Sequence, residues 1–300
     1  MKKIVILPLI LLIFSCDKVD RPIENKGSTV LDETLYPGSW SDYPWPTFEQ
    51  NTNTNRNILL EDYTGHTCVY CPAAADVAHQ LEEENASRLF VASIHASPGG
   101  IGDFQKLEPP TFVHDFTTPE GIQYGVTFED GYGFVGNPRG TINRMIFSDY
   151  MFQPASNWAN IISTVLTENQ LKVNLQSKIN FFETTRGLFL HTEIDPKETP
   201  PDSIQLVTYF IENDFVAPQK KNGEGTIMDY HHHNVHRGNL DGLAFGRKLD
   251  ETYKREDGLY QIDISYKIPE AYTAANCHVL VYAMNPKTYE IYQVIKVLIE

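Results

Sequence analysis

Two cysteines, Cys68 and Cys71, are spaced C-x-x-C where an apolar, strand-like run (57–63) gives way to a helical run (72–84). Pro72 suits the first turn of a helix, because proline has no N–H group to leave unpaired there. A helix dipole stabilises a thiolate at the helix N-terminus, and a second thiol one turn away can close or resolve a disulfide. The spacing therefore indicates thiol–disulfide chemistry.

Two other readings of the cysteine pair stay open at this point. A zinc site would need a second pair of ligands, and the remaining cysteines, Cys16 and Cys277, are isolated in the sequence. A purely structural disulfide requires nothing beyond the pair itself. We expect Cys277, at the start of a predicted strand, to be a buried free thiol that packs as a small apolar side chain.

Acidic residues and a distal proline strengthen the redox interpretation. Asp62 lies six residues before Cys68 on the incoming strand. In thioredoxins an acidic residue at that spacing lies buried below the cysteines and helps to move their protons, so the resemblance implies that role for Asp62 or for its neighbour Glu61. Only one of the two can point inward, since adjacent strand residues face opposite ways. Pro138, in the segment 136–141, resembles the cis-proline loop that packs against the cysteines in thioredoxin-like folds.

The start of the chain is typical of an export signal. Lys2 and Lys3 precede an apolar stretch, 4–14, which is shorter than the roughly 20 residues that a membrane-spanning helix needs. Cys16 follows directly, and the run 13–16 resembles a bacterial lipobox. We therefore predict a lipoprotein signal peptide over 1–15 and a lipid on Cys16 that holds the protein to a membrane, in a compartment that permits disulfides.

Composition and pattern divide the mature chain into three parts. The formal net charge of −15 argues against nucleic acid as a partner, and 41% apolar residues suffice for sizeable cores. We predict a lipidated tether over 16–56, an α/β domain over 57–170 and an all-β domain over 171–300. The last is an antiparallel β-sandwich, with strands expected at 171–182, 187–194, 203–212, 259–268, 278–284 and 290–298.

Taken together, three segments resemble the 28-kilodalton outer-membrane-protein family of Bacteroidetes lipoproteins. They are the cysteine-bearing run 60–72, the proline-bearing segment 138–144 and a histidine-rich stretch in an all-β tail. The resemblance implies a thioredoxin-like domain followed by a β-sandwich, anchored in the outer membrane and facing the periplasm or the cell surface.

Two functions follow as expectations. The first is a thiol–disulfide oxidoreductase without cofactor that acts on cell-envelope protein thiols and disulfides, with Cys68 attacking, Cys71 resolving, Asp62 or Glu61 relaying protons and Pro138 shaping the partner groove. The second is a non-enzymatic lipoprotein that recognises a peptide, a glycan or an outer-membrane protein, with the cysteines locked in a structural disulfide.

Histidines form the remaining cluster that could do chemistry. His66, two residues before Cys68, could lower a thiol pKa when it is protonated. The stretch 230–237 would place His232 and His236 on one face of a strand, and His231 and His233 on the other. These four imidazoles are candidate zinc or copper ligands, but the sequence positions no thiol or carboxylate beside them. We therefore expect a polar edge strand or loop without metal.

Overall fold

The computed structural model describes residues 31–198 and 203–300. The predicted signal peptide, 1–15, and the predicted lipidation site, Cys16, lie outside the described residues. Within the described ranges, no helix combines the length and the apolar character that a membrane span requires.

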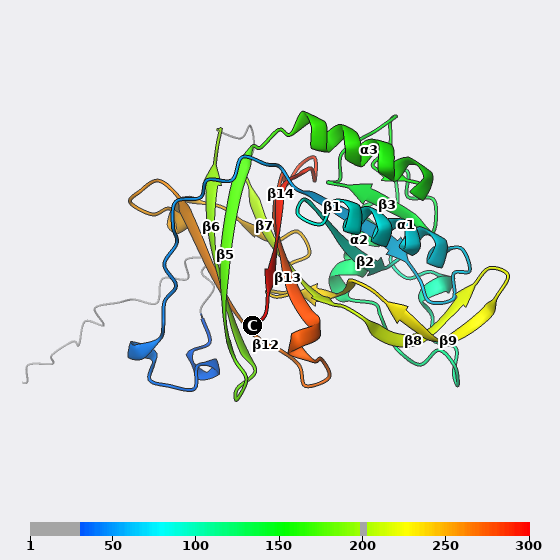
Figure 1. Ribbon diagram of the computed structural model, residues 1–300, viewed down its shortest axis with the longest axis horizontal. Helices are drawn as coiled ribbons and strands as arrows, with labels where there is room; N and C mark the ends of the chain where they lie inside the picture. The colour runs from blue at the N-terminus through cyan, green and yellow to red at the C-terminus, as the bar shows by residue number, and fades with distance from the viewer. Residues whose placement is uncertain (1–30, 199–202) are drawn as a thin grey trace, which may run out of the picture.

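A mixed β-sheet of nine strands forms the centre of the molecule (Figure 1), in the order β14-β13-β7-β10-β2-β1-β3-β4 with β11 paired to β7. β1 runs parallel to β2 and antiparallel to β3. The strands are β1 (Ile58–Thr64), β2 (Leu89–His95), β3 (Arg139–Ile142), β4 (Phe152–Gln153), β7 (Gln205–Glu212), β10 (Val235–Asn239), β11 (Arg247–Lys248), β13 (Cys277–Met284) and β14 (Ile291–Leu298).

Helices cover both faces of the sheet around β1. α1 (Cys71–Glu84) and α3 (Ala155–Glu168) share one apolar core with Ile58 and Leu60, whereas α2 (Pro119–Thr127) packs on the opposite face with Leu59. Every residue of β1 is therefore buried, which explains why its sequence reads as a continuous apolar run. The same alternation sends Glu61 and Asp62 to opposite faces.

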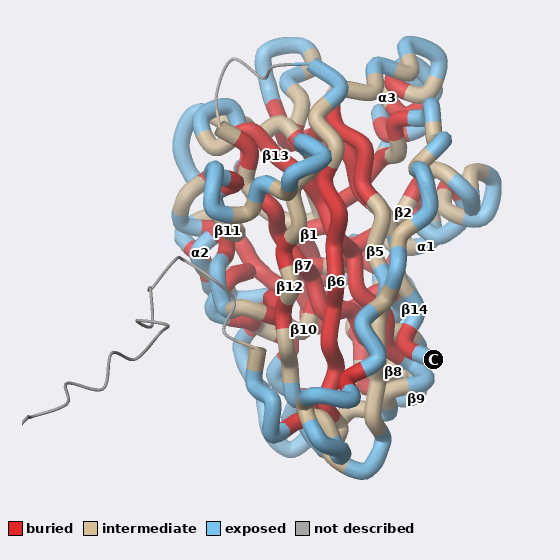
Figure 2. The backbone as a smooth tube through the Cα atoms, turned by 90° about the vertical axis from the view of Figure 1, so that its left-hand side faces the viewer, coloured by how far each residue is buried: buried red, intermediate tan, exposed pale blue. Residues whose placement is uncertain are grey.

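A second layer of three antiparallel strands, in the order β12-β6-β5, packs on the β7, β13 and β14 part of the large sheet. These strands are β5 (Val173–Phe182), β6 (Gly187–Pro196) and β12 (Tyr260–Lys267). Figure 2 shows that buried residues follow the strands of both layers. The chain is thus β-rich, with antiparallel strands over most of 171–300 as predicted.

β10 joins the two parts of the large sheet. Val235 pairs with Ser93 of β2 on one side, and β10 pairs antiparallel with β7 on the other. Strands from 57–170 and from 171–300 therefore lie in one hydrogen-bonded sheet, and the division into two domains at residue 170 stays a prediction.

The described part of the predicted tether packs on the second layer. Two short 3-10 helices, η1 (Glu33–Leu35) and η2 (Trp40–Asp42), bring Leu35 and Tyr43 against Phe189 of β6. The Tyr43 hydroxyl lies 2.7 Å from the His191 Nε2 atom, beneath the same aromatic cluster. Residues 31–56 thus cover the face of β6 that points away from the large sheet. The other 3-10 helices are η3 (Asp103–Gln105), η4 (Glu251–Tyr253) and η5 (Ala274–Asn276).

A two-stranded hairpin, β8 (Phe215–Lys221) and β9 (Gly225–His232), connects β7 to β10. Figure 1 shows it in yellow beside α1, away from the second layer. The sequence analysis considered an edge strand only over 230–237 and predicted none over 215–229, although Asn222-Gly223 at the turn is a typical hairpin signal.

Local backbone geometry determines two element boundaries. β3 ends at Ile142, because Asn143 and Arg144 adopt positive φ angles of 49° and 50° and turn the chain back. The Asn143 side-chain oxygen accepts a hydrogen bond from the Leu59 N–H group and so fixes this turn. α1 begins at Cys71, one residue before the predicted helical run 72–84.

Candidate functional site

The predicted pair of cysteines forms a disulfide at the N-terminus of α1. Cys68 and Cys71 have Cα atoms 5.4 Å apart, and each residue is only 1% exposed. Cys71 is the first residue of α1 and Cys68 lies in the preceding turn, where its carbonyl oxygen accepts a hydrogen bond from the Cys71 N–H group. The first cysteine thus precedes the helix, in agreement with the predicted helical run 72–84.

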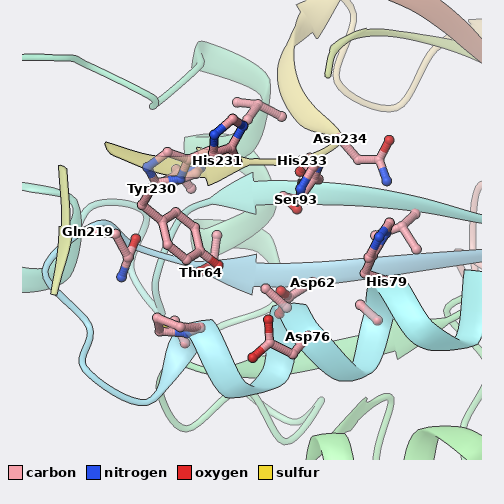
Figure 3. A pocket seen from close by; sticks show the side chains of 18 residues that line it. Asp62, Thr64, Asp76, His79, Ser93, Gln219, Tyr230, His231, His233 and Asn234 are labelled. Carbon is pink, nitrogen blue, oxygen red and sulfur yellow. Dashed lines mark hydrogen bonds between the residues drawn. The ribbon is translucent and has the colours of Figure 1, made fainter. Parts of the chain in front are cut away.

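Asp62 occupies the position below the disulfide. It is 1% exposed, and neither of its carboxylate oxygens has a hydrogen-bond partner. Burial raises its pKa from 3.8 to about 7, because water no longer stabilises the charged form. Asp62 and Cys71 line the same cavity of about 240 Å³, together with residues of α1, β2 and β9 (Figure 3).

Glu61, the other predicted candidate, belongs to a different environment. Its carboxylate pairs with Arg144 at 2.7 Å and accepts hydrogen bonds from the hydroxyls of Thr141 and Tyr209. Burial alone would raise the pKa of Glu61, but the charge and hydrogen bonds of Arg144, with the two hydroxyls, lower it below its usual value. The structure therefore brings Asp62, and not Glu61, to the cavity beside the disulfide.

Three buried histidines surround the disulfide loop and Phe116. The ring of His95 stacks on Phe116 with centroids 4.5 Å apart, and His232 lies 4.7 Å from the same ring. His66 stacks on Phe112, and its Nε2 atom lies 2.9 Å from the Lys106 carbonyl oxygen. Nitrogens of all three histidines lack partners.

These histidines favour the neutral form. Burial is the largest cause that lowers the pKa of His66, of His95 and of His232, the last to about 4. His66 is therefore uncharged at neutral pH. The expectation that a protonated His66 lowers a cysteine pKa does not hold under those conditions, because the imidazole sits in an apolar wall.

The hairpin β8–β9 covers one side of the disulfide loop. Gln219 donates hydrogen bonds from Nε2 to the carbonyl oxygens of Cys68 and Gly65, at 3.1 and 3.3 Å. The backbone N–H groups of Lys220 and Asn222 donate to the carbonyls of His66 and Val69, both at 2.9 Å. The hairpin thus binds the loop along its length, and Gln219 was not among the residues that the sequence analysis selected.

The segment between β2 and α2 holds the other side of the loop. The N–H group of Thr67 donates to the Phe104 carbonyl oxygen at 3.3 Å, and the Gln105 side chain donates to the Thr64 carbonyl oxygen at 2.7 Å. Only the residues between the cysteines face solvent, and Tyr70 is 63% exposed. A partner molecule reaches the sulfur atoms only after one of these covering segments has moved.

Pro138 stands directly before β3, and the Asn137–Pro138 peptide bond is cis. Tyr63, near the end of β1, pairs with Arg139. The loop that holds Pro138 therefore lies at the same end of the sheet as the disulfide loop. The Gln105 side chain contacts both, since its Nε2 atom also lies 3.4 Å from the Asn137 side-chain oxygen.

The histidine-rich stretch does not form the continuous strand that was considered. β9 ends at His232, Asn234 adopts a positive φ of 53°, and β10 begins at Val235. This turn separates His232, beside Phe116, from His236, which contacts the Thr118 hydroxyl and the Asn239 side chain. No group of three metal-ligating side chains gathers within residues 31–198 and 203–300.

Cys277 is a free, buried thiol, as predicted. Its Sγ atom donates to the Thr273 carbonyl oxygen at 3.3 Å, and burial raises the pKa of the thiol to about 12. It therefore stays protonated and takes no part in the chemistry of the Cys68–Cys71 pair.

Solved structures resemble this chain to different degrees. HBP35 of Porphyromonas gingivalis has a TM-score of 0.62 at 17% identity, over 82% of this chain and 76% of that chain. A domain of the outer membrane lipoprotein Omp28 from the same organism has a TM-score of 0.31 at 17% identity, over 43% of this chain and 88% of that one. A protein from Agrobacterium tumefaciens has a TM-score of 0.49 at 11% identity, over 83% and 96%. No curated protein matches the chain.

The family comparison covers more than half of the chain. The model of the family described as outer membrane protein Omp28 matches residues 126–300. This range contains Pro138, the strands of the second layer, and the hairpin that covers the disulfide loop. It also contains the strands of the large sheet from β3 onward, whereas Cys68 and Cys71 precede it. The chain therefore belongs to the Omp28 family of outer-membrane proteins, which confirms the family resemblance and the outer-membrane location predicted from the sequence.

Proposed function

We propose that this protein is a thiol–disulfide oxidoreductase with a thioredoxin-like site. The order of elements supports this proposal. A disulfide stands between β1 and α1, β2 returns parallel to β1, and β3 runs antiparallel to β1 directly after Pro138. Thioredoxin-like folds have their two cysteines between the corresponding strand and helix, and their proline directly before the corresponding antiparallel strand.

The observation that carries the proposal is the unpartnered carboxyl of Asp62. A buried carboxylate without a hydrogen bond costs several kcal/mol of stability, and nothing in the packing of β1 requires an acid there. With a pKa of about 7, Asp62 exchanges its proton at neutral pH. It lines the same cavity as Cys71, so it is suited to accept a proton from the Cys71 thiol.

The reaction follows from these positions. In the reduced protein, the Cys68 thiolate attacks one sulfur of a substrate disulfide, forms a mixed disulfide and expels a substrate thiolate, which takes up a proton. Cys71 then loses its proton to Asp62 and attacks the Cys68 sulfur, so that the second substrate thiol leaves. The protein dithiol has been oxidised to the disulfide and the substrate disulfide reduced to two thiols, with two electrons transferred.

The proposed substrates are thiols and disulfides of cell-envelope proteins. A lipid on Cys16 would hold the enzyme at the outer membrane, with residues 16–56 between the anchor and the region that carries the disulfide. We propose that 57–170 forms the thioredoxin-like domain and 171–300 the β-sandwich, which also supplies the hairpin over the active cysteines.

The reduction potential of the Cys68–Cys71 pair tests the function. Mature protein is equilibrated with glutathione buffers, and free thiols are trapped and counted by mass spectrometry. We expect a potential above about −250 mV, in the range of exchangeable disulfides. A Cys68→Ser variant that reduces a disulfide substrate as fast as the wild type would refute the assignment of Cys68 as the attacking thiol.

One observation favours the alternative function, a non-enzymatic envelope lipoprotein that recognises a peptide, a glycan or an outer-membrane partner. Both cysteines are 1% exposed and covered on two sides, as expected for a structural bridge. A potential below about −300 mV, together with thiols that react with an alkylating reagent only after unfolding, would support this alternative and exclude the enzyme.

A further inference from the structure

The cavity beside Cys71 contains acidic groups without matching bases. Asp62 lies on β1 and Asp76 on α1, and Figure 3 shows both carboxyl groups on the helix side of the cavity, with Tyr230 nearby. No residue that lines the cavity is a lysine or an arginine. Both carboxylate oxygens of Asp62 lack partners, so the buried acid points into a space that its own chain leaves unfilled.

Five histidines line the cavity. His79 and His231 contact the carboxylates of Glu83 and Asp214, at 3.5 and 2.5 Å, and not those of Asp62 or Asp76. His95, His232 and His233 have lowered pKa values, with burial the largest cause, and are uncharged at neutral pH. Burial, followed by the charges of Asp76 and Asp62, raises the pKa of Tyr230 to about 12. The phenol therefore stays protonated between the two acids.

Nearby lysines have other partners. The Lys221 ammonium, on the neighbouring strand, pairs with Glu224 at 3.1 Å, and the charge of Asp76 also raises the Lys221 pKa. The Lys220 ammonium pairs with Glu108 at 2.9 Å. Asp76 is exposed to water and has Lys221 nearby, whereas the residues that line the cavity offer the buried Asp62 no cation. Asp62 therefore avoids the cost of an unpaired buried charge only by keeping its proton.

We propose that this cavity binds the ammonium or guanidinium group of a lysine or arginine that flanks the reacting cysteine of a substrate polypeptide. The inference rests on the proposed function and names its substrate class. Asp76 at the exposed side and Asp62 at the buried side would pair with the cation, and the Tyr230 ring offers an aromatic face. A bound metal fits less well, because no three metal-ligating side chains gather in the described part of the chain.

Binding of a cation here would couple recognition to chemistry. A positive charge near Asp62 favours its ionised form, so the cation displaces the proton from the carboxyl. The resulting carboxylate is the base that Cys71 needs when it resolves the mixed disulfide. A basic substrate would therefore prepare the second step of its own reaction.

The test compares two peptide disulfides. The reduced protein is mixed with the disulfide dimer of Ac-Ser-Lys-Cys-Ser-NH₂ or of the same peptide with norleucine in place of lysine, and oxidation of Cys68–Cys71 is followed by acid quench and mass spectrometry. Because Asp76 is exposed, one charged pair with it predicts a reaction that is roughly threefold faster with the lysine peptide. Asp76→Asn should bring this ratio close to one.

A matched control separates the cavity from the general acidity of the protein. Glu84 lies on the same helix, α1, is exposed and does not line the cavity. Glu84→Gln removes the same charge and should keep the rate ratio of the wild type. Equal ratios in the Asp76→Asn and Glu84→Gln variants would overturn the inference.

Failure of the inference and failure of the proposed function give different results. Normal oxidation by both peptides with a ratio near one overturns the cation site and leaves the oxidoreductase intact. No oxidation by either peptide or by oxidised glutathione refutes the oxidoreductase. In that case the cation site is tested separately, by carbon NMR titration of the Asp62 carboxyl in the disulfide form of the protein. N-acetyl-lysine methylamide should lower the Asp62 pKa, and its norleucine analogue should not. Equal effects of the two compounds would overturn the proposed cation site.

Discussion

Replacement of Asp62 by asparagine should stabilise the protein at neutral and alkaline pH. The folded state holds the Asp62 proton up to about pH 7, whereas the unfolded chain releases it near its ordinary pKa of 3.8. The folded state is therefore penalised progressively as the pH rises between these values, and the penalty is complete above pH 7. A shift of about 3 pH units corresponds to about 4 kcal/mol. Asparagine has nearly the same shape and carries no charge, so it escapes this penalty.

The assay is urea unfolding of the disulfide-bonded wild type and Asp62→Asn at pH 4 and at pH 8. The free energies of unfolding of the two proteins should differ by less than about 1 kcal/mol at pH 4. At that pH the Asp62 carboxyl is protonated in the folded state and somewhat less than half protonated in the unfolded chain. At pH 8 the variant should be more stable by about 4 kcal/mol. Other titrating groups cancel in the difference between the two proteins. A difference that is the same at both pH values would refute the reasoning, since it would mean that Asp62 is not held neutral by burial.

Three further perturbations test other parts of the structure. Gln219→Ala removes both side-chain hydrogen bonds to the disulfide loop. Dithiothreitol should therefore reduce the Cys68–Cys71 disulfide roughly tenfold faster, as measured by thiol trapping. An unchanged rate would show that the hairpin does not limit access of the reductant to the disulfide. Glu61→Gln leaves Arg144 buried without its charged partner and should lower the free energy of unfolding in urea by about 3–5 kcal/mol; a loss below 1 kcal/mol would contradict this. Burial lowers the pKa of His236 to about 4 in the folded protein, whereas the same imidazole takes up a proton near pH 6.5 in the unfolded chain. Because the unfolded state binds the proton first, the wild type should lose about 3 kcal/mol of stability from this group as the pH falls from 6.5 to 4. His236→Gln should show a correspondingly shallower acid dependence, and an identical slope would refute it.

The sequence predicted the elements that depend on local pattern. The apolar run of β1 and the helical run of α1 determined those elements to within a few residues. The separation of three residues made the Cys68–Cys71 disulfide predictable. The choice between Glu61 and Asp62 was not predictable. β1 is covered on both faces, so its sequence has no polar side that would indicate the direction of either acid. Only Arg144, which is distant in the sequence, identifies Glu61 as the carboxylate with a charged partner.

The hairpin β8–β9 that covers the disulfide loop could not be predicted from local sequence pattern either. Pro218, Lys220 and Lys221 interrupt the alternation expected of a strand, so β8 carries a weak signal of its own. Asn222-Gly223 indicates a turn but not the surface that the hairpin covers. That surface depends on contacts between segments far apart in the sequence, such as the pairing of Val235 in β10 with Ser93 in β2 and the hydrogen bonds of Gln219 to the disulfide loop.

The long sequence separation between the disulfide and the hairpin that covers it also has a consequence during synthesis of the chain. Gln219 lies 151 residues after Cys68, and proteins are made from the N-terminus onward. While the later part of the chain is still being made, the two thiols have no hairpin over them, and the edge of β2 that later pairs with β10 is open. The nascent protein is therefore most exposed to oxidants, and to pairing with a foreign strand, before residues 215–239 arrive to close both surfaces.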